Sequence, residues 1–414
     1  MLNKFEGNGK SNKNSIEIYN NSKIRSSNFE LLRIIAMIMI IIYHIVFHCI
    51  ICQLTDLKSI ERMNNGWFCH PLWYKKMLAL EIIMPFGIIS NAIFMIIAGY
   101  FGINKDNDLK RIEKTEKKLI FQSLFVTIWL VLFSAILYQL NKNDYLSMID
   151  LYHFNNSSWY VGYYFLIILI SYIFLNKYLK KFTKQEYLTF LIILFSLLSF
   201  SWTKNLMDSF ANGLSILSTG IFLYSLGGYI KKYNPFKDFN VFVFIGIIII
   251  ANIFLCISFY NTTVNNIDNY NLSDSTKKYV YIFPNFENNN YIIIIISICM
   301  FEIFRRIKIK NNRIVNFIGA STFMIYLIHD NAFFYSIWGL TDWITLLYNN
   351  PYSFIGKLLL QTLYTFGFGL ITYTIYIVII KIITEIKNKK KTDINIIKWL
   401  PHGISKKMLA IFTC

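Results

Sequence analysis

The chain has 414 residues, of which 55% are hydrophobic and 15% are charged, and its mean hydropathy is +0.44. These values exclude a water-soluble enzyme and favour a protein embedded in a lipid bilayer. The 41 Lys and Arg residues outnumber the 23 Asp and Glu residues, and the resulting formal net charge of +18 raises the question of a nucleic-acid partner. The six Cys residues are scattered, so neither a disulfide framework nor a metal site is indicated.

Residues 1–28 are polar and rich in Asn and Lys, and they are predicted to form a disordered basic cytoplasmic tail without a cleavable signal peptide. From Leu31 onward, apolar runs long enough to cross a bilayer as helices alternate with polar loops. The expected fold is an all-α polytopic bundle of about ten transmembrane helices within residues 29–383, followed by a basic cytoplasmic tail at 384–414. The ten predicted spans are 31–51, 80–103, 119–140, 159–176, 187–203, 211–230, 239–260, 290–304, 314–335 and 355–380.

Lys and Arg residues are divided unequally between the two sets of predicted loops. Cytoplasmic loops retain positive charge, whereas loops that are moved across the membrane carry little of it. With both termini in the cytoplasm, the cytoplasmic segments carry 31 Lys and Arg residues and the outer loops carry 8. Topology and attraction to anionic lipid therefore explain the net charge, so the predicted partner is the bilayer of the cell membrane and no nucleic acid is expected.

Ionisable residues inside membrane spans are costly and therefore point to function. Arg33 and His44 are eleven residues apart in the first predicted span. At about 100° and 1.5 Å per residue, they project from one helix face at a separation of about 16 Å along the axis. An Arg suits a phosphate-bearing ligand, and a buried neutral imidazole suits proton abstraction. In the alternative interpretation, Arg33 snorkels to the headgroups and His44 bonds a neighbouring helix.

Four motifs resemble the acyltransferase-3 family of integral membrane proteins. FELLRIIAMIMIIIYH at 29–44 has the family's Arg, ten-residue, His spacing, and SNAIFMIIAGYF at 90–101 is similar to the end of the family's second helix, with Ala98 in place of the usual Ser. SSWYVGYYFLIILISYIFLN at 157–176 resembles the fourth helix, and IGASTFMIYLIHDN at 318–331 resembles the final Tyr-Leu-Ile-His segment. The resemblance extends from residue 29 to about residue 383.

The resemblance implies an O-acyltransferase that takes cytoplasmic acyl-CoA, usually acetyl-CoA, and acylates a hydroxyl of an extracytoplasmic polysaccharide or lipid-linked glycan. No permanently bound cofactor is expected. His44 is then the general base or, alternatively, a covalent acyl carrier. The further catalytic candidates are Arg33, Glu81 and His329, where His329 is preferred to the adjacent Asp330. The expected CoA-binding residues are Arg33, Lys110, Arg111, Lys114 and Lys118, and the expected acceptor-binding residues are Trp159, Tyr160 and Asn91.

Two other classes of protein remain open. A glycan or lipid transporter would also be a long polytopic chain with buried charges, but inverted repeats and paired Gly- or Pro-broken helices are not evident. A catalytically degenerate membrane sensor would share the helices, and the replacement at Ala98 keeps this class open. Acyl-CoA hydrolysis or transfer by the purified protein would separate an enzyme from both.

Overall fold

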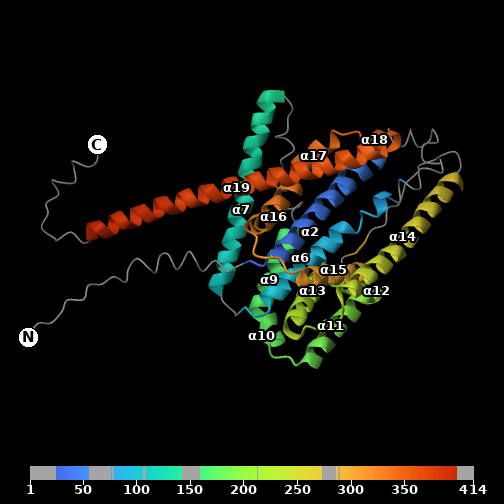
Figure 1. The fold of residues 1–414 in the computed structure, drawn as a ribbon, viewed down its shortest axis with the longest axis horizontal. Coiled ribbons are helices and arrows are strands. Elements are labelled where there is room, and N and C mark those ends of the chain that lie inside the picture. The colour runs from blue at the N-terminus through green and yellow to red at the C-terminus, as the bar shows by residue number, and fades with distance from the viewer. Residues whose placement is uncertain are drawn as a thin grey trace, which may run out of the picture.

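The computed structural model describes residues 25–55, 76, 79–105, 109–141, 159–211, 213–272, 286–287 and 290–398. Within these residues every regular element is a helix, which confirms the predicted all-α class (Figure 1). Two π-helical segments, η1 (Val46–Ile50) and η2 (Ser171–Leu175), continue α2 and α9. The α-helices are α2 (Ser27–Ile45), α3 (Ile51–Thr55), α6 (Phe86–Gly102), α7 (Leu109–Asn141), α9 (Trp159–Ile170), α10 (Asn176–Leu179), α11 (Lys184–Ser199), α12 (Ser201–Phe210), α13 (Leu214–Tyr233), α14 (Val241–Leu272), α15 (Tyr291–Arg306), α16 (Arg313–His329), α17 (Ala332–Gly339), α18 (Trp343–Asn349) and α19 (Pro351–Lys398).

Six helical stretches of the described chain are long and apolar enough to cross a membrane, so the protein is a multi-pass membrane protein. They are Ser27–Gln53, Ala79–Gly102, Ile112–Leu140, Trp159–Leu179, Val241–Thr262 and Pro351–Ile386. A seventh candidate joins α11 to α12. The ten predicted spans exceed this number, partly because α15 and α16 have only 16 and 17 residues.

Two predicted spans are interrupted, and the prediction of a continuous helix was wrong for both. The span predicted at 314–335 ends as a helix at His329, because the Asn331 side chain accepts the backbone N–H of Phe333 and begins α17. The span predicted at 187–203 turns through 83° between α11 and α12. Apolar residues resume after the first break, at Ala332, Phe333 and Phe334, so hydropathy averaged over a whole span does not reveal it.

The two predicted tails fall mostly outside the described residues, which exclude 1–24 and 399–414. Where the structure does describe them, helix extends further than expected. α2 begins at Ser27, inside the predicted N-terminal tail, and α19 continues to Lys398, inside the predicted C-terminal tail.

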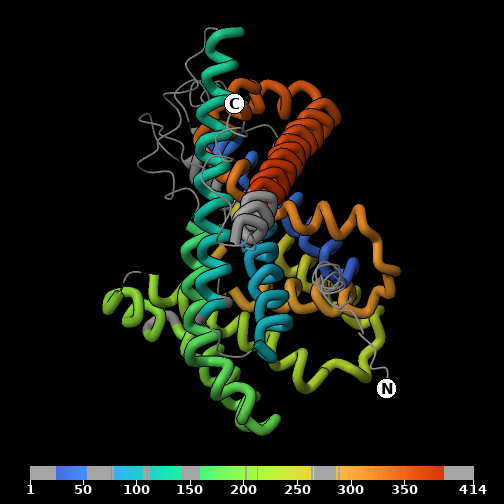
Figure 2. Tube along the Cα trace, turned by 90° about the vertical axis from the view of Figure 1, so that its left-hand side faces the viewer, coloured from blue at the N-terminus to red at the C-terminus, as the bar shows by residue number. Residues whose placement is uncertain are grey.

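α2 and α6 form the centre of the bundle. α2 packs against α6, α16, α19 and α15, and α6 packs against α13, α2 and α15. In their apolar stretches, 67% of α6 is buried, compared with 17% of α14 and of α19. The exposed Ile, Leu and Phe side chains of α14 and α19 are therefore the lipid-facing surface. These two helices lie at opposite sides of the bundle, and α7 extends beyond it at one end (Figures 1 and 2).

Glycine allows α6 and α13 to approach closely. A Cβ atom at Gly99 would lie 1.8 Å from the backbone oxygen of Tyr224, and one at Gly227 would lie 2.2 Å from the backbone oxygen of Ile96. Small residues commonly permit such contacts between membrane helices, because no side chain separates the two backbones. Larger residues at these two positions would force the helices apart.

Hydrogen bonds join the first helix to the last third of the chain. The Ser27 hydroxyl donates to Oδ1 of Asn316 at 2.9 Å at the start of α2. At the other end, Gln53 Nε2 donates to the backbone oxygen of Thr341 at 2.7 Å. These contacts fix both ends of the helix that carries Arg33 and His44.

Candidate functional site

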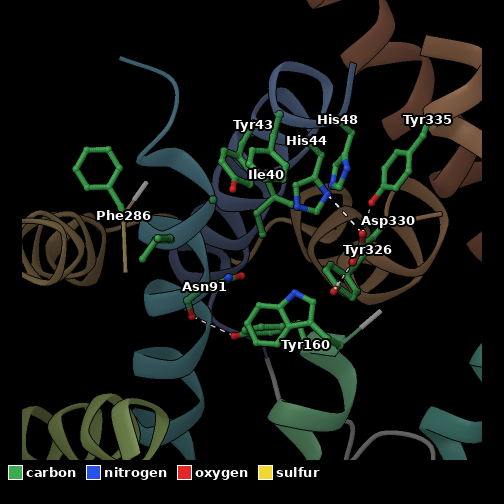
Figure 3. Close-up of a pocket in the computed structure, with 14 residues that line it drawn as sticks. Ile40, Tyr43, His44, His48, Asn91, Tyr160, Phe286, Tyr326, Asp330 and Tyr335 are labelled. Carbon is green, nitrogen blue, oxygen red and sulfur yellow. Dashed lines mark hydrogen bonds and ion pairs between the residues drawn. The ribbon is translucent and has the colours of Figure 1, made fainter. Parts of the chain in front are cut away.

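His44 lies in the last turn of α2, and its side chain lines a cavity of about 480 Å³. α6, α9 and the turn between α16 and α17 contribute the facing residues. Figure 3 shows His44 grouped with His48, Asp330 and Tyr335 at one side of this cavity. The structure thus places an imidazole that is 15% exposed against a carboxylate and a phenol.

Two phenols hold Asp330 in the turn between α16 and α17. The Tyr326 hydroxyl donates to Oδ2 at 2.7 Å, and the Tyr335 hydroxyl donates to Oδ1. The residue is 3% exposed, so these hydrogen bonds replace the water that a buried carboxylate loses. Oδ1 lies 3.7 Å from His44 Nδ1, which is longer than a hydrogen bond but close enough for a strong charge interaction. Asp330 is therefore positioned to stabilise positive charge on His44.

A π-helical turn begins two residues after His44. The segment η1 contains His48, and π-turns are frequent at functional sites. The His48 ring stacks on the Tyr335 ring, with centroids 4.1 Å apart and planes at 16°, and it meets His44 edge-on at 5.2 Å. The Cys49 thiol donates to the backbone oxygen of Tyr335 at 3.4 Å. Together these contacts hold Tyr335 where its hydroxyl reaches Asp330.

The His329 side chain packs against the His44 ring. The two rings stack with centroids 4.9 Å apart and planes at 26°. His329 Nδ1 lies 3.2 Å from the backbone oxygen of Ile325, and a carbonyl can only accept, so Nδ1 carries the proton. Nε2 then has no hydrogen-bond partner among the described residues. His329 is fully buried and contacts His44 through its ring face, so its geometry suits positioning.

The three residues predicted to bind the acceptor line the His44 cavity together. Trp159 and Tyr160 come from the start of α9 and Asn91 comes from α6. The Tyr160 hydroxyl donates to the backbone oxygen of Asn91 at 3.0 Å, which fixes α9 against α6 (Figure 3). Trp159 is 44% exposed and lines the same cavity.

Arg33 lines a second cavity, of about 260 Å³. Arg25 and Lys118 also line it. The Glu30 carboxylate accepts from Arg33 at 2.8 Å and from Arg25 at 3.1 Å. Among the described residues, three cations thus face one carboxylate, and the cavity carries net positive charge. Ala98 contributes to the same lining.

The two cavities adjoin each other along α2. Ile40, Tyr160 and Tyr326 line both of them, and the Tyr160 and Tyr326 ring centroids lie 5.8 Å apart. One layer of side chains therefore separates the cationic Arg33 cavity from the His44 cavity. The predicted stripe on α2 connects the two, with a rise of about 16 Å over eleven residues.

Three of the remaining predicted residues, Lys110, Lys114 and Glu81, line neither cavity. Lys110 and Lys114 are exposed on α7 and do not line the Arg33 cavity, and the side chain of Arg111 lies outside the described residues. Glu81 is fully buried just before α6 and lines neither cavity. Of the five predicted CoA-binding residues, the structure brings together Arg33 and Lys118.

Sequence reasoning passed over Asp330 and did not consider the two tyrosines that bond it. One signal was present, because Tyr326 and Asp330 are four residues apart and therefore share a helix face. A second signal was Asn331, a residue type that favours the first position of a new helix. Tyr335 had no comparable signal, because its contact depends on the turn that follows α16.

The comparisons with known proteins identify one family. A family model described as an acyltransferase domain, acyltransferase 3, matches residues 26–381. No curated protein and no solved structure matches the chain.

Proposed function

We propose that this chain, which belongs to the acyltransferase-3 family, moves an acyl group from acyl-CoA to a carbohydrate hydroxyl. The family match over residues 26–381 confirms the family resemblance and extends over nearly all of the described helices. Acetyl-CoA as the donor, a polysaccharide or lipid-linked glycan as the acceptor, the cell membrane as the location and the roles of individual residues are our proposals.

The observation that carries this function is the pair of adjoining cavities along α2. One is cationic and contains Arg33, and the other contains His44 beside Asp330. The unequal distribution of Lys and Arg supports a cytoplasmic opening for the Arg33 cavity and an outer opening for the His44 cavity. Such an arrangement suits a donor that enters on one side and an acceptor that enters on the other.

Donor binding is assigned to the Arg33 cavity. A guanidinium makes two parallel hydrogen bonds to a phosphate, and Lys118 and Arg25 add charge beside it. The pantetheine arm then extends along α2 past Tyr160 and Tyr326 toward His44. This route brings the thioester to the imidazole while the nucleotide stays at the cationic end.

The chemistry is assigned to His44. As the acceptor hydroxyl attacks the thioester carbonyl, the imidazole takes the hydroxyl proton, and the carbon–sulfur bond breaks to release CoA thiolate, which then takes the proton from the imidazolium. Nδ1 is the nitrogen that faces Asp330, so Nε2 is assigned the proton transfer. The Asp330 carboxylate stabilises the imidazolium, and His329 keeps the ring in place.

Acceptor binding is assigned to the aromatic side of the His44 cavity. Trp159 and Tyr160 offer ring faces on which a sugar can stack, and Asn91 offers an amide that both donates and accepts. The cavity of about 480 Å³ lies within the usual size range of small-ligand sites. A terminal sugar of a larger glycan is therefore the proposed occupant.

The test uses the purified full chain in liposomes with labelled acetyl-CoA and a glycan acceptor. His44→Ala and His44→Gln should each lower acetyl transfer by at least ~10² to 10⁴, the contribution of a positioned proton acceptor. Both variants should fold, because loss of one interhelical hydrogen-bonding group costs about 1 kcal/mol. Acetyl-CoA binding, followed by thermal shift, should persist because Arg33 is unchanged.

Lys184→Gln is the control, because it alters an exposed residue that lines neither cavity and is not among the predicted CoA-binding residues, and its transfer rate should match that of the wild type. Near-normal transfer by His44→Gln at wild-type abundance would overturn the mechanism. Label that crosses the membrane without becoming covalently attached to the glycan would instead support a transporter.

A further inference from the structure

Three side chains with metal-binding groups meet at one side of the His44 cavity. His44, His48 and Asp330 each present one ligand atom, and these atoms all lie within 4.8 Å of one another. His44 Nδ1 and Asp330 Oδ1 are 3.7 Å apart, and Nδ1 has no hydrogen-bond partner among the described residues. In a tetrahedral zinc site with bonds of about 2.0–2.1 Å, neighbouring ligand atoms lie roughly 3.3 Å apart. The three ligand atoms therefore reach metal-binding spacing if the cluster closes by up to about 1.5 Å.

The three groups come from elements that are already packed together. His44 and His48 are four residues apart on one helix, which places both imidazoles on the same side. Asp330 comes from the turn between α16 and α17, and Tyr335 on α17 stacks on His48. The sequence predicts no metal site because Asp330, the third ligand, is far from the two histidines in the sequence. No local spacing motif contains all three residues.

We propose that His44, His48 and Asp330 bind a divalent transition-metal ion such as Zn²⁺, and that the bound ion inhibits acyl transfer. Two imidazoles and one carboxylate are a donor set that Zn²⁺ accepts, and the adjoining cavity supplies room for a water ligand. Mg²⁺ and Ca²⁺ prefer oxygen ligands and fit this donor set poorly. The inhibition rests on the proposed function, whereas the binding does not.

Inhibition follows because a neutral imidazole has one ring proton and only one nitrogen with a free lone pair. A metal bond at His44 Nδ1 uses the lone pair of that nitrogen, so the single ring proton of the neutral side chain remains on Nε2. Nε2 then has no lone pair with which to accept the acceptor hydroxyl's proton. The ion also binds the Asp330 carboxylate. One binding event therefore blocks both the base, His44, and the carboxylate that stabilises its positive charge. No bond in the protein is broken, and removal of the ion by a chelator restores the base.

Tyr335 provides a test that separates metal binding from packing. Its hydroxyl donates to Oδ1 of Asp330, the same oxygen that faces His44. A metal ion must compete with this phenol for the oxygen. Tyr335→Phe keeps the ring that stacks on His48 but removes the competitor, so it should tighten metal binding. A purely structural role for Tyr335 predicts the opposite sign or no change.

The experiment titrates the purified, chelator-treated full chain in detergent with Co²⁺, whose visible absorption reports its coordination, and then displaces it with Zn²⁺. His48→Asn and Asp330→Asn should weaken binding by at least ~10-fold, since even supporting residues around metal ligands cost 10- to 100-fold when changed. Cys256→Ser is the matched control, because it removes a metal-binding group on α14 that lies outside the cluster, and it should bind Co²⁺ like the wild type.

Wild-type Co²⁺ affinity in both His48→Asn and Asp330→Asn would overturn the site. For the inhibition, transfer is measured with and without Zn²⁺ for each variant against its own metal-free rate. Zn²⁺ should inhibit the wild type and spare His48→Asn, and equal inhibition of both would overturn the regulatory step. If the wild type transfers no acetyl, the proposed function fails, while the Co²⁺ titration still decides the metal site.

Discussion

Replacement of Asp330 by Asn removes the charge beside His44 while keeping the shape of the side chain. His44 Nδ1 and Asp330 Oδ1 are 3.7 Å apart, and their side chains are only 15% and 4% exposed. At an effective dielectric constant of about 20, opposite unit charges at this distance attract by about 4 kcal/mol. This attraction exists only when the imidazole is charged, which in our mechanism occurs during transfer. The expected loss in transfer rate is therefore ~10³-fold.

The amide introduced by Asp330→Asn can still accept one phenol hydrogen bond and donate to the other phenol oxygen, so the turn between α16 and α17 should persist. The assay is acetyl transfer by the reconstituted chain, with abundance and thermal stability measured in parallel. Tyr326→Phe is the comparison, because it removes one hydrogen bond to the carboxylate but leaves the charge, and its loss should be much smaller. A rate for Asp330→Asn within a few-fold of the wild type, at equal abundance, would refute the assignment of Asp330 to His44.

Three further predictions address packing, donor binding and topology. Gly99→Ala should lower stability by at least about 1–3 kcal/mol in a thermal or denaturant assay, because its Cβ collides with backbone, whereas Gly246→Ala, which meets open space, should be neutral or slightly stabilising. Arg33→Ala should weaken acetyl-CoA binding and Arg33→Lys should restore it only in part, since an ammonium lacks the two-pronged phosphate contact; equal affinity in all three proteins would reduce Arg33 to a partner of its neighbouring carboxylate. Reporter fusions should place residues 104–118 and both termini in the cytoplasm and residues 141–158 outside, and termini on opposite faces would contradict the predicted orientation.

Local periodicity was enough to predict the pairing of Arg33 and His44 on one face, because both lie on the same regular helix. Family motifs were enough to single out Asn91, Trp159 and Tyr160, which line the His44 cavity. In these cases the deciding information lies within one helix or within a motif of known order.

The partner of His44 required the tertiary structure. His329 and Asp330 are adjacent, and a continuous helix would point them in different directions, so only one was chosen. The helix in fact stops between them, and the turn brings the carboxylate to Nδ1 while His329 stacks on the same ring. The described residues have six or seven candidate spans where ten were predicted, and an apolar run reveals that a segment is buried but not whether its helix bends.

The hydrogen bonds that join the first helix to the last third of the chain have a consequence for biosynthesis. His44 and Asp330 are 286 residues apart in the sequence. At the usual ~5–20 residues per second, the ribosome needs roughly 15–60 s after making the histidine before it makes the carboxylate. Throughout this interval the nascent protein has the imidazole but not its partner. The Ser27–Asn316 bond also forms only after α16 has been made, so the site that we propose is assembled only when the chain is nearly finished.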